Sequence, residues 1–258
     1  MSDEVTIPES EPRSGLLTQL RLAISFLTIL PVIDRRPASE DAVARSLGAF
    51  PLVGLAIGFA LVGEDWLLAH LLGQVIRSVL LVASLVVLTG GIHLDGLADT
   101  ADALGAGRDR ERALEILRDS RVGTFGACAI FFDLTLKILA LSTLAGDRRY
   151  AALIFAPMLA RWAMPLVSAG LPYLRSSGAG STLLKKGSLG SPFISIVSLL
   201  FVTLLWGVRP LALGIVIASA TMLAMRLFYR RWLGGVTGDL IGACGELVEI
   251  AVLVTMAS

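Results

Sequence analysis

Seven segments of this chain are apolar over a length that could cross a lipid bilayer as a helix. Hydrophobic residues make up 55% of its 258 residues and charged residues 17%, whereas soluble proteins average about 25% charged residues. A spanning helix needs about 20 predominantly apolar residues. The expected spans are 47–63, 67–92, 122–145, 150–172, 191–207, 210–225 and 239–256. The sequence therefore predicts an all-α fold, a polytopic integral membrane bundle of about seven transmembrane helices.

Two of the apolar stretches carry a charge. Arg77 interrupts 67–92, which is either one long tilted helix or an interfacial piece followed by a short span. Leu16–Val32 contains Arg21 and ends soon after Pro31. We expect this stretch to form a short interfacial amphipathic helix, not an eighth span.

The N-terminal region differs in composition from the rest of the chain. Residues 1–14 are polar, include two prolines and lack the basic start and apolar centre of a signal peptide. We expect them to form a disordered cytoplasmic tail, followed by a single membrane-embedded domain over residues 15–258.

The basic residues are distributed unevenly between alternate loops. Of 22 lysines and arginines, sixteen fall on the side that includes the N-terminal region, three on the other side and three within the spans. Basic loops stay in the cytoplasm, so the N-terminus is predicted to be cytoplasmic and the C-terminus external. The net charge of +1 gives no bulk basicity that would indicate a nucleic-acid partner.

The stretch GGIHLDGLADTADALGAGRDRERALEILRDSRVGTFG, residues 90–126, follows directly on the second apolar segment. Asp95, Asp99 and Asp102 are spaced by four and three residues, which places them on one face of a helix. Like charges so close repel one another, so a cation is expected among them, and carboxylate oxygens suit Mg²⁺. We expect these three aspartates, with Asp119, to bind Mg²⁺; the alternative is that they are solvated and paired with nearby arginines.

A second acidic series begins the last apolar segment. Asp239 is followed by Glu246 and Glu249 on a helix that runs into the seventh span. Carboxylates inside a bilayer are costly and usually functional, so Asp239 is a catalytic candidate and the two glutamates are candidates for substrate binding. His93, just before the acidic face, is a candidate proton carrier.

Basic residues beside the acidic motif are candidates for binding phosphate. Arg118 and Arg121 carry permanently charged guanidinium groups that fit phosphate oxygens. Lys185 and Lys186 could bind an anionic substrate or lipid headgroups, or simply contribute to the charge bias of the cytoplasmic side.

Three further charges lie inside predicted spans. Asp133 and Lys137 are four residues apart and are expected to pair. Arg161 needs an acidic partner, and Glu246 or Glu249 could supply it. Such intramembrane charges also leave open an ion-coupled transporter, although no internal repeat of the kind common in transporters is found.

The sequence resembles the bacterial cobalamin synthase family, the adenosylcobinamide-GDP ribazoletransferases. The resemblance is carried by the aspartate-rich motif of residues 90–126, by LGGVTGDLIGACGELVEI near the C-terminus and by SFLTILPV near the N-terminus. The resemblance implies that a ribose hydroxyl of α-ribazole, or of its 5′-phosphate, attacks the phosphate linked to cobinamide and that GMP leaves. It implies a transferase domain with Mg²⁺ as the metal, in the bacterial inner membrane with its site on the cytoplasmic face.

This resemblance leaves one enzyme alternative and several details open. A lipid-forming enzyme of the CDP-alcohol phosphatidyltransferase type would use a similar aspartate-rich helix, but it would release CMP. The partners implied are adenosylcobinamide-GDP, α-ribazole or its 5′-phosphate, and the lipid bilayer, with no nucleic acid. A homo-oligomer is left open, as is the choice of the carboxylate that acts as base.

Overall fold

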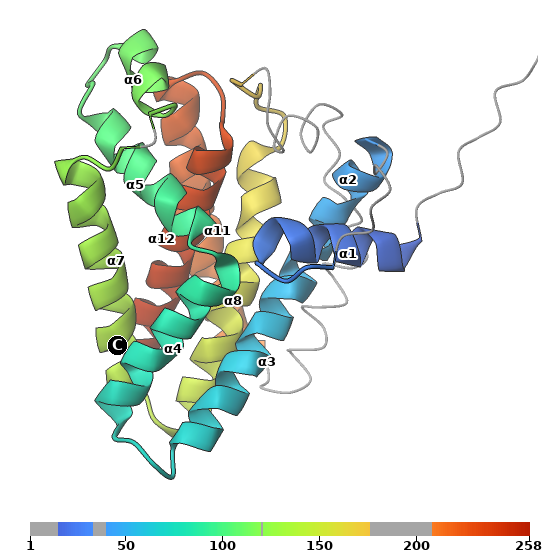
Figure 1. The fold of residues 1–258 in the computed structure, drawn as a ribbon, viewed down its shortest axis with the longest axis vertical. Coiled ribbons are helices and arrows are strands. Elements are labelled where there is room, and N and C mark those ends of the chain that lie inside the picture. Colours follow the sequence, from blue (N-terminus) through green and yellow to red (C-terminus); the bar gives the residue numbers. More distant parts are fainter. Residues whose placement is uncertain (1–14, 33–39, 120, 176–207) are drawn as a thin grey trace, which may run out of the picture.

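The computed structural model describes residues 15–32, 40–119, 121–175 and 208–258, and in these ranges the chain forms a helical bundle (Figure 1). The helices are α1 (Leu16–Leu27), α2 (Glu40–Ser46), the 3₁₀ turn η1 (Leu47–Ala49), α3 (Phe50–Leu68), α4 (Gln74–Thr89), α5 (Ile92–Leu104), α6 (Arg110–Ile116), α7 (Thr124–Thr143), α8 (Gly146–Ser168), α11 (Val208–Trp232) and α12 (Gly238–Ala257). The predicted all-α class is therefore confirmed.

Five helices of the described ranges are long and apolar enough to span a membrane, and a sixth span results if α4 and α5 are counted as one broken helix. The helices α7, α8, α11 and α12 correspond to four of the expected spans. The expected span 191–207 lies outside the described residues. The chain is thus a multi-pass membrane protein, and seven is an approximate count of its spans.

The predicted boundary between the first two spans is wrong. We expected the first span to end at residue 63 and the second to begin at residue 67, whereas α3 runs on to Leu68 and α4 begins at Gln74. Two acidic residues lie inside α3 because each has a partner. Glu64 accepts a hydrogen bond from Ser84, and buried Asp65 forms ion pairs with arginines of α4 and α8.

Two consecutive glycines separate α4 from α5. Gly90 and Gly91 have φ angles of 63° and 66°, a left-handed conformation that glycine adopts at little cost. The two helices meet at 91°, so α5 leaves the direction of the preceding span. We therefore treat α5 and its acidic face as lying at the rim of the bundle, outside the spanning segments.

Helix α1 lies across the bundle beside this bend (Figure 1). After the helix, the backbone N–H of Ile29 donates to the carbonyl of Leu88 at 2.9 Å, which attaches the segment to the end of α4. Leu16 and Leu17 remain exposed. These observations agree with an amphipathic helix, and its placement at the membrane interface stays a prediction.

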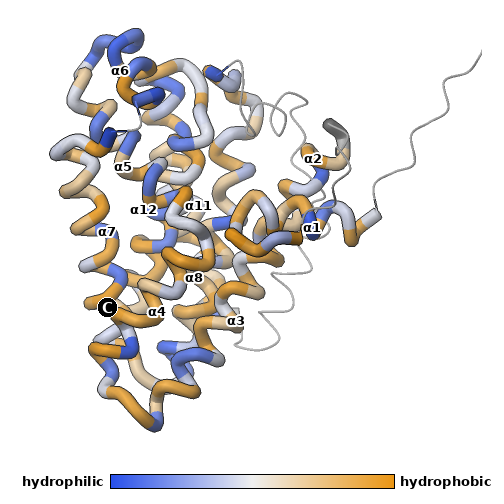
Figure 2. Tube along the Cα trace, viewed as in Figure 1, coloured by the Kyte–Doolittle hydropathy of each residue, from blue (hydrophilic) through white to orange (hydrophobic). Residues whose placement is uncertain are grey.

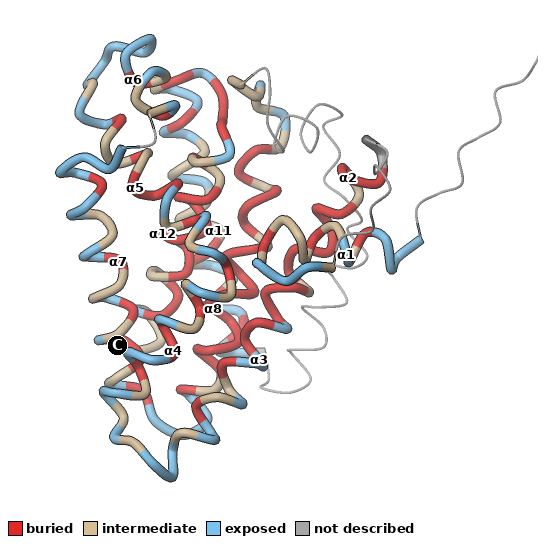
Figure 3. Tube along the Cα trace, viewed as in Figure 1, coloured by how far each residue is buried: buried red, intermediate tan, exposed pale blue. Residues whose placement is uncertain are grey.

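Helix α8 forms the centre of the bundle, and most of its residues are buried (Figure 3). It packs closely on α3, because a Cβ atom at Gly54 would lie 2.4 Å from the carbonyl oxygen of Pro157. Hydrophilic residues gather along α6 at one end of the bundle, whereas apolar residues predominate along α3 and α7 (Figure 2). The polar end of the molecule is therefore the end that α5 and α6 form.

Candidate functional site

The site is built where α5 crosses the beginning of α12. A Cβ atom at Gly96 would lie 2.8 Å from the backbone oxygen of Asp239, and one at Gly242 would lie 3.2 Å from the Cα atom of His93. Two glycines, one from each helix, thus permit the close contact. The crossing brings the acidic face of α5 beside Asp239, which is 143 residues further along the chain than Gly96.

Four aspartates gather at this crossing, and we call Asp95, Asp99, Asp102 and Asp239 the acidic cluster. Burial and the carboxylate of Asp95 raise the pKa of Asp99 to about 7, with further contributions from Asp239 and Asp102, while Arg175 acts in the opposite direction. Three neighbouring carboxylates thus add to the effect of burial, and Arg175 only partly offsets them. The cluster is therefore electrostatically suited to bind a cation.

Asp102 also has a structural contact. Its two carboxylate oxygens accept hydrogen bonds from the backbone N–H groups of Gly123 and Gly126, at 2.6 and 2.9 Å. These groups belong to the first turn of α7, where backbone N–H groups have no partner within the helix and a carboxylate is favourable. Asp102 thus fixes the start of α7 against α5.

Asp239 is paired with a basic residue that was not among the site residues predicted from the sequence. The Nη2 atom of Arg175 lies 2.5 Å from a carboxylate oxygen of Asp239, and the same nitrogen donates to the carbonyl of Leu117. Thr237 begins α12 by accepting a hydrogen bond from the backbone of Leu240 and donates its hydroxyl to Asp239. The only sequence signal for Arg175 was its place directly after the fourth span, on the same side as the aspartate-rich motif.

Two of the predicted phosphate ligands, Arg118 and Arg121, lie on the surface together with Asp119, which was predicted to bind the metal. Arg118 and Arg121 are exposed. Asp119 forms an ion pair of 2.6 Å with Arg121. Hydrogen bonds from the side chain and the backbone N–H of Arg121 lower the pKa of Asp119 to about 2. Its contacts therefore differ from those of the acidic cluster. Lys185 and Lys186 lie outside the described residues.

The five charges predicted to lie inside the spans form two sets of ion pairs. Lys137 is 3.1 Å from Asp133, as expected from their spacing, and it also pairs with Glu246. Arg161 lies 2.8 Å from Glu249, which confirms that it has one of the two proposed partners. Because each glutamate neutralises a buried cation, the structure gives both a structural function, and their assignment to substrate binding stays a prediction.

His93 is buried near these ion pairs. It lies at the beginning of α5, where Arg161, Glu249 and Lys137 are its charged neighbours. Its Nδ1 atom has no hydrogen-bond partner among the described residues. The structure thus places His93 beneath the acidic cluster, between α5 and the interior of the bundle, and its role as a proton carrier is untested.

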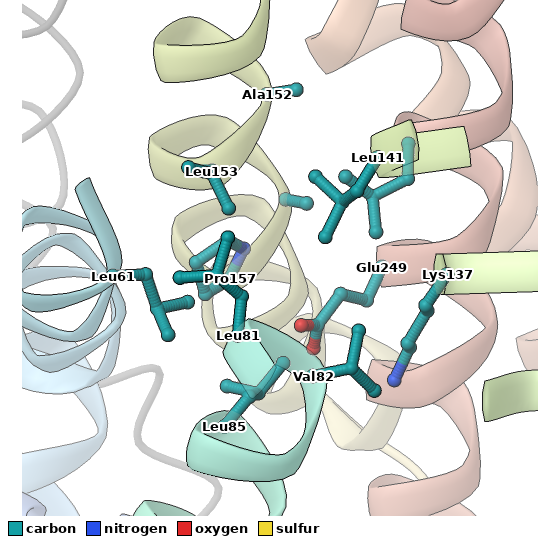
Figure 4. A pocket seen from close by; sticks show the side chains of 12 residues that line it. Leu61, Leu81, Val82, Leu85, Lys137, Leu141, Ala152, Leu153, Pro157 and Glu249 are labelled. Atoms are coloured by element: carbon teal, nitrogen blue, oxygen red, sulfur yellow. The ribbon is translucent and has the colours of Figure 1, made fainter. Parts of the chain in front are cut away.

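A pocket in the middle of the bundle is too apolar to bind a nucleotide. Its lining comes mostly from leucine, valine and alanine side chains of α3, α4, α7, α8 and α12, with Lys137 and Glu249 on one side (Figure 4). Both charged groups already have partners in ion pairs. A ligand that carries phosphate would therefore be expected at the polar rim, beside the acidic cluster.

The acidic cluster fits a metal ion that is shared with a ligand. Within the ranges that the structure describes, no three His, Cys, Asp or Glu side chains are placed to hold one metal ion together. Mg²⁺ commonly uses one or two protein carboxylates and completes its octahedral shell with water and phosphate oxygens. The donor chemistry therefore suits Mg²⁺ bound jointly with a phosphate-bearing substrate, and the assignment of individual ligands stays a prediction.

The fold and the site together define a multi-pass helical membrane protein with a carboxylate-rich site at one end of its bundle. The family model for cobalamin-5-phosphate synthase matches residues 19–257. The chain belongs to this family.

Known relatives cover the chain almost completely. An adenosylcobinamide-GDP ribazoletransferase from Roseiflexus sp. (strain RS-1) is 38% identical, over 99% of this chain and 96% of the relative. A protein of the same description from Bradyrhizobium diazoefficiens is 36% identical over 98% of both chains, and one from Syntrophobacter fumaroxidans is 37% identical over 90% and 94%. No solved structure matches the chain.

Proposed function

We propose that this protein joins α-ribazole, or its 5′-phosphate, to adenosylcobinamide-GDP and releases GMP. A ribose hydroxyl forms a new ester bond to the phosphorus that carries cobinamide, the bond between the two phosphates breaks, and GMP leaves with the electron pair. The product is adenosylcobalamin or its 5′-phosphate. The observation that carries the proposal is the acidic cluster of α5 and α12 at the polar end of a bundle whose family and relatives have this activity.

In this proposal Mg²⁺ is held by carboxylates of the acidic cluster. Asp95, Asp99 and Asp239 are the first choices, because Asp102 binds two backbone N–H groups and Asp119 binds Arg121. Bound there, Mg²⁺ would neutralise charge on the diphosphate. Burial and the carboxylates of Asp95, Asp239 and Asp102 raise the pKa of Asp99, and a cation bound among these carboxylates would offset their repulsion.

The remaining roles fall to side chains around the cluster. A carboxylate that is not committed to the metal accepts the proton of the attacking hydroxyl. Arg118 and Arg121 are exposed in the segment that joins α6 to α7 and bind phosphate oxygens as charge builds up on them. His93 is buried below the cluster and orients α5.

We place the protein in the bacterial inner membrane with this end of the bundle in the cytoplasm. The support is the excess of lysine and arginine on the side that carries the acidic motif. This location would give the site access to nucleotide-linked substrates from the cytoplasm.

The decisive experiment measures GMP release by the purified protein in detergent. The mixture contains adenosylcobinamide-GDP and α-ribazole 5′-phosphate, with Mg²⁺ or with EDTA. We expect GMP and a matching cobalamin product with Mg²⁺, and loss of both with EDTA. Release of CMP from a CDP-alcohol, without GMP release, would instead support a lipid-forming enzyme.

A transporter is the weaker alternative. The charges within the bundle that suggested it, Asp133, Lys137, Arg161, Glu246 and Glu249, are all held in ion pairs. This pairing removes the observation that favoured transport.

A further inference from the structure

Arg175 is fixed at the edge of the acidic cluster by backbone contacts. The segment after α8 runs alongside the segment before α12, with hydrogen bonds of 2.9 Å from Leu174 to Val236 and from Val236 to Pro172. A Cβ atom at Gly235 would lie 2.4 Å from the carbonyl oxygen of Pro172, so only glycine permits this approach. The backbone that precedes Arg175 is therefore held firmly, and its side chain starts from a defined position.

The guanidinium of Arg175 is only partly used by its contacts with the protein. Its Nη2 atom binds Asp239 and the carbonyl of Leu117. Its Nε atom is buried and has no hydrogen-bond partner among the described residues. Arginine presents donors in a planar fork that matches phosphate oxygens, and the side chains of Arg175 and Asp239 are 29% and 18% exposed. A ligand at the rim can thus reach part of the guanidinium, and the buried Nε donor would become available to it once the ion pair with Asp239 opens.

The charges around Asp239 favour a change of partner for both Asp239 and Arg175 when a metal ion and a diphosphate bind. Asp239 belongs to a cluster of four carboxylates, and among the described residues Arg175 is a cation that counteracts their mutual repulsion at Asp99. A divalent cation bound to the cluster would compete with Arg175 for Asp239. A diphosphate beside that cation would offer the released guanidinium several anionic oxygens in return.

We propose that Arg175 binds the diphosphate of the donor substrate and that its ion pair with Asp239 holds it only while the site is empty. This inference rests on the proposed function, because it takes a nucleoside diphosphate group as the ligand. It makes Arg175 a substrate-binding residue, and in the absence of metal Asp239 competes with the substrate for Arg175.

The test compares two variants whose effects on GDP binding must have opposite signs. GDP affinity is measured by calorimetry on the purified full chain in detergent, with EDTA present. Arg175→Gln should lower the affinity at least tenfold, because the guanidinium is lost. Asp239→Asn should raise it several-fold, because the arginine is freed and a repelling carboxylate is removed. If the ion pair only stabilises the fold, the two variants will change the affinity in the same direction or not at all, and the proposal is wrong.

Controls separate this effect from general charge and from misfolding. Arg230→Gln removes the same charge from an exposed position on α11 and should leave GDP affinity within twofold of wild type. Arg175→Lys keeps the charge but loses the fork. If Arg175→Gln does not fold, the lysine variant decides: we expect its KM for adenosylcobinamide-GDP to rise more than its kcat falls, and an unchanged KM would overturn the proposal.

The same data distinguish this inference from the proposed function. If the wild type releases GMP and Arg175→Gln binds GDP normally, Arg175 is structural and the proposed reaction stands. If the wild type neither binds GDP nor releases GMP, both the reaction and the role of Arg175 are rejected.

Discussion

Asp99 is flanked by Asp95 and Asp102 on one face of α5 and is affected by Asp239 of α12. Each of these carboxylates repels the others, and a bound cation would remove that repulsion. The position of Asp99 at the centre of the cluster makes it the residue whose change tests the metal assignment most directly.

Replacing Asp99 with asparagine should lower turnover by at least 100-fold at saturating substrate, because the amide cannot supply the charge that holds Mg²⁺. The measurement is GMP release over a range of Mg²⁺ concentrations, and the variant should also need more Mg²⁺ for half-maximal rate. Asp147→Asn, which changes an exposed aspartate in the first turn of α8, is the matched control. Turnover of Asp99→Asn within a few-fold of wild type would show that the metal assignment is wrong.

Single residues also show which contacts could be predicted from the sequence and which could not. The pairing of Asp133 with Lys137 followed from their spacing, because both lie on one helix. The second partner of Lys137 is Glu246, 109 residues away, and no local pattern connects them. Arg175 was counted only as a cytoplasmic charge, because its contact with Asp239 depends on how the segments before α12 and after α8 pack.

At the scale of helices, the contact between α5 and α12 determines the shape of the site. The acidic face of α5 could be predicted from the 4–3 spacing of its aspartates, and the start of α12 from its apolar run. Their crossing could not, since it depends on the left-handed Gly90 and Gly91 and on the close approach of two glycine-bearing helices. The predicted boundary between α3 and α4 was wrong for a similar reason. Buried Asp65 can lie inside α3 because it pairs with arginines of α4 and α8, and the local sequence does not reveal these partners.

Gly96→Ala should separate these two helices. The added Cβ atom would meet the backbone of Asp239 at 2.8–3.2 Å, and a helix backbone cannot move as a flexible side chain can. Overpacking of this kind typically costs about 1–3 kcal/mol, so we expect a lower Tm in detergent and a loss of turnover that exceeds the loss of folded protein.

The control for this substitution is Gly63→Ala in α3, where no atom lies within 4 Å of the new Cβ. An exchange of glycine for alanine inside a helix is otherwise favourable by about 0.5–1 kcal/mol, so this variant should be as stable as wild type or more so. Equal effects of the two substitutions would contradict the close α5–α12 contact.

For the whole molecule, the remaining question is which end of the bundle faces the cytoplasm. Helix α6 lies at one end and the C-terminus toward the other (Figure 1), and the aspartate-rich motif is at the α6 end. Sixteen of the 22 basic residues were assigned to the same side as this motif and only three to the opposite side. Because basic loops are retained in the cytoplasm, the α6 end should be cytoplasmic.

Cysteine labelling in intact spheroplasts tests this orientation. In a background without the two native cysteines (Cys128→Ala, Cys244→Ala), a membrane-impermeant maleimide should label Ser258→Cys directly but Glu111→Cys of α6 only after lysis. Both positions are exposed, so access depends on the side of the membrane and not on burial. Labelling of both before lysis would contradict the arrangement of the helices, because the fold separates the two ends. The reverse order would leave the fold intact but place the acidic cluster outside the cell, away from the cytoplasmic nucleotide that the proposed reaction requires.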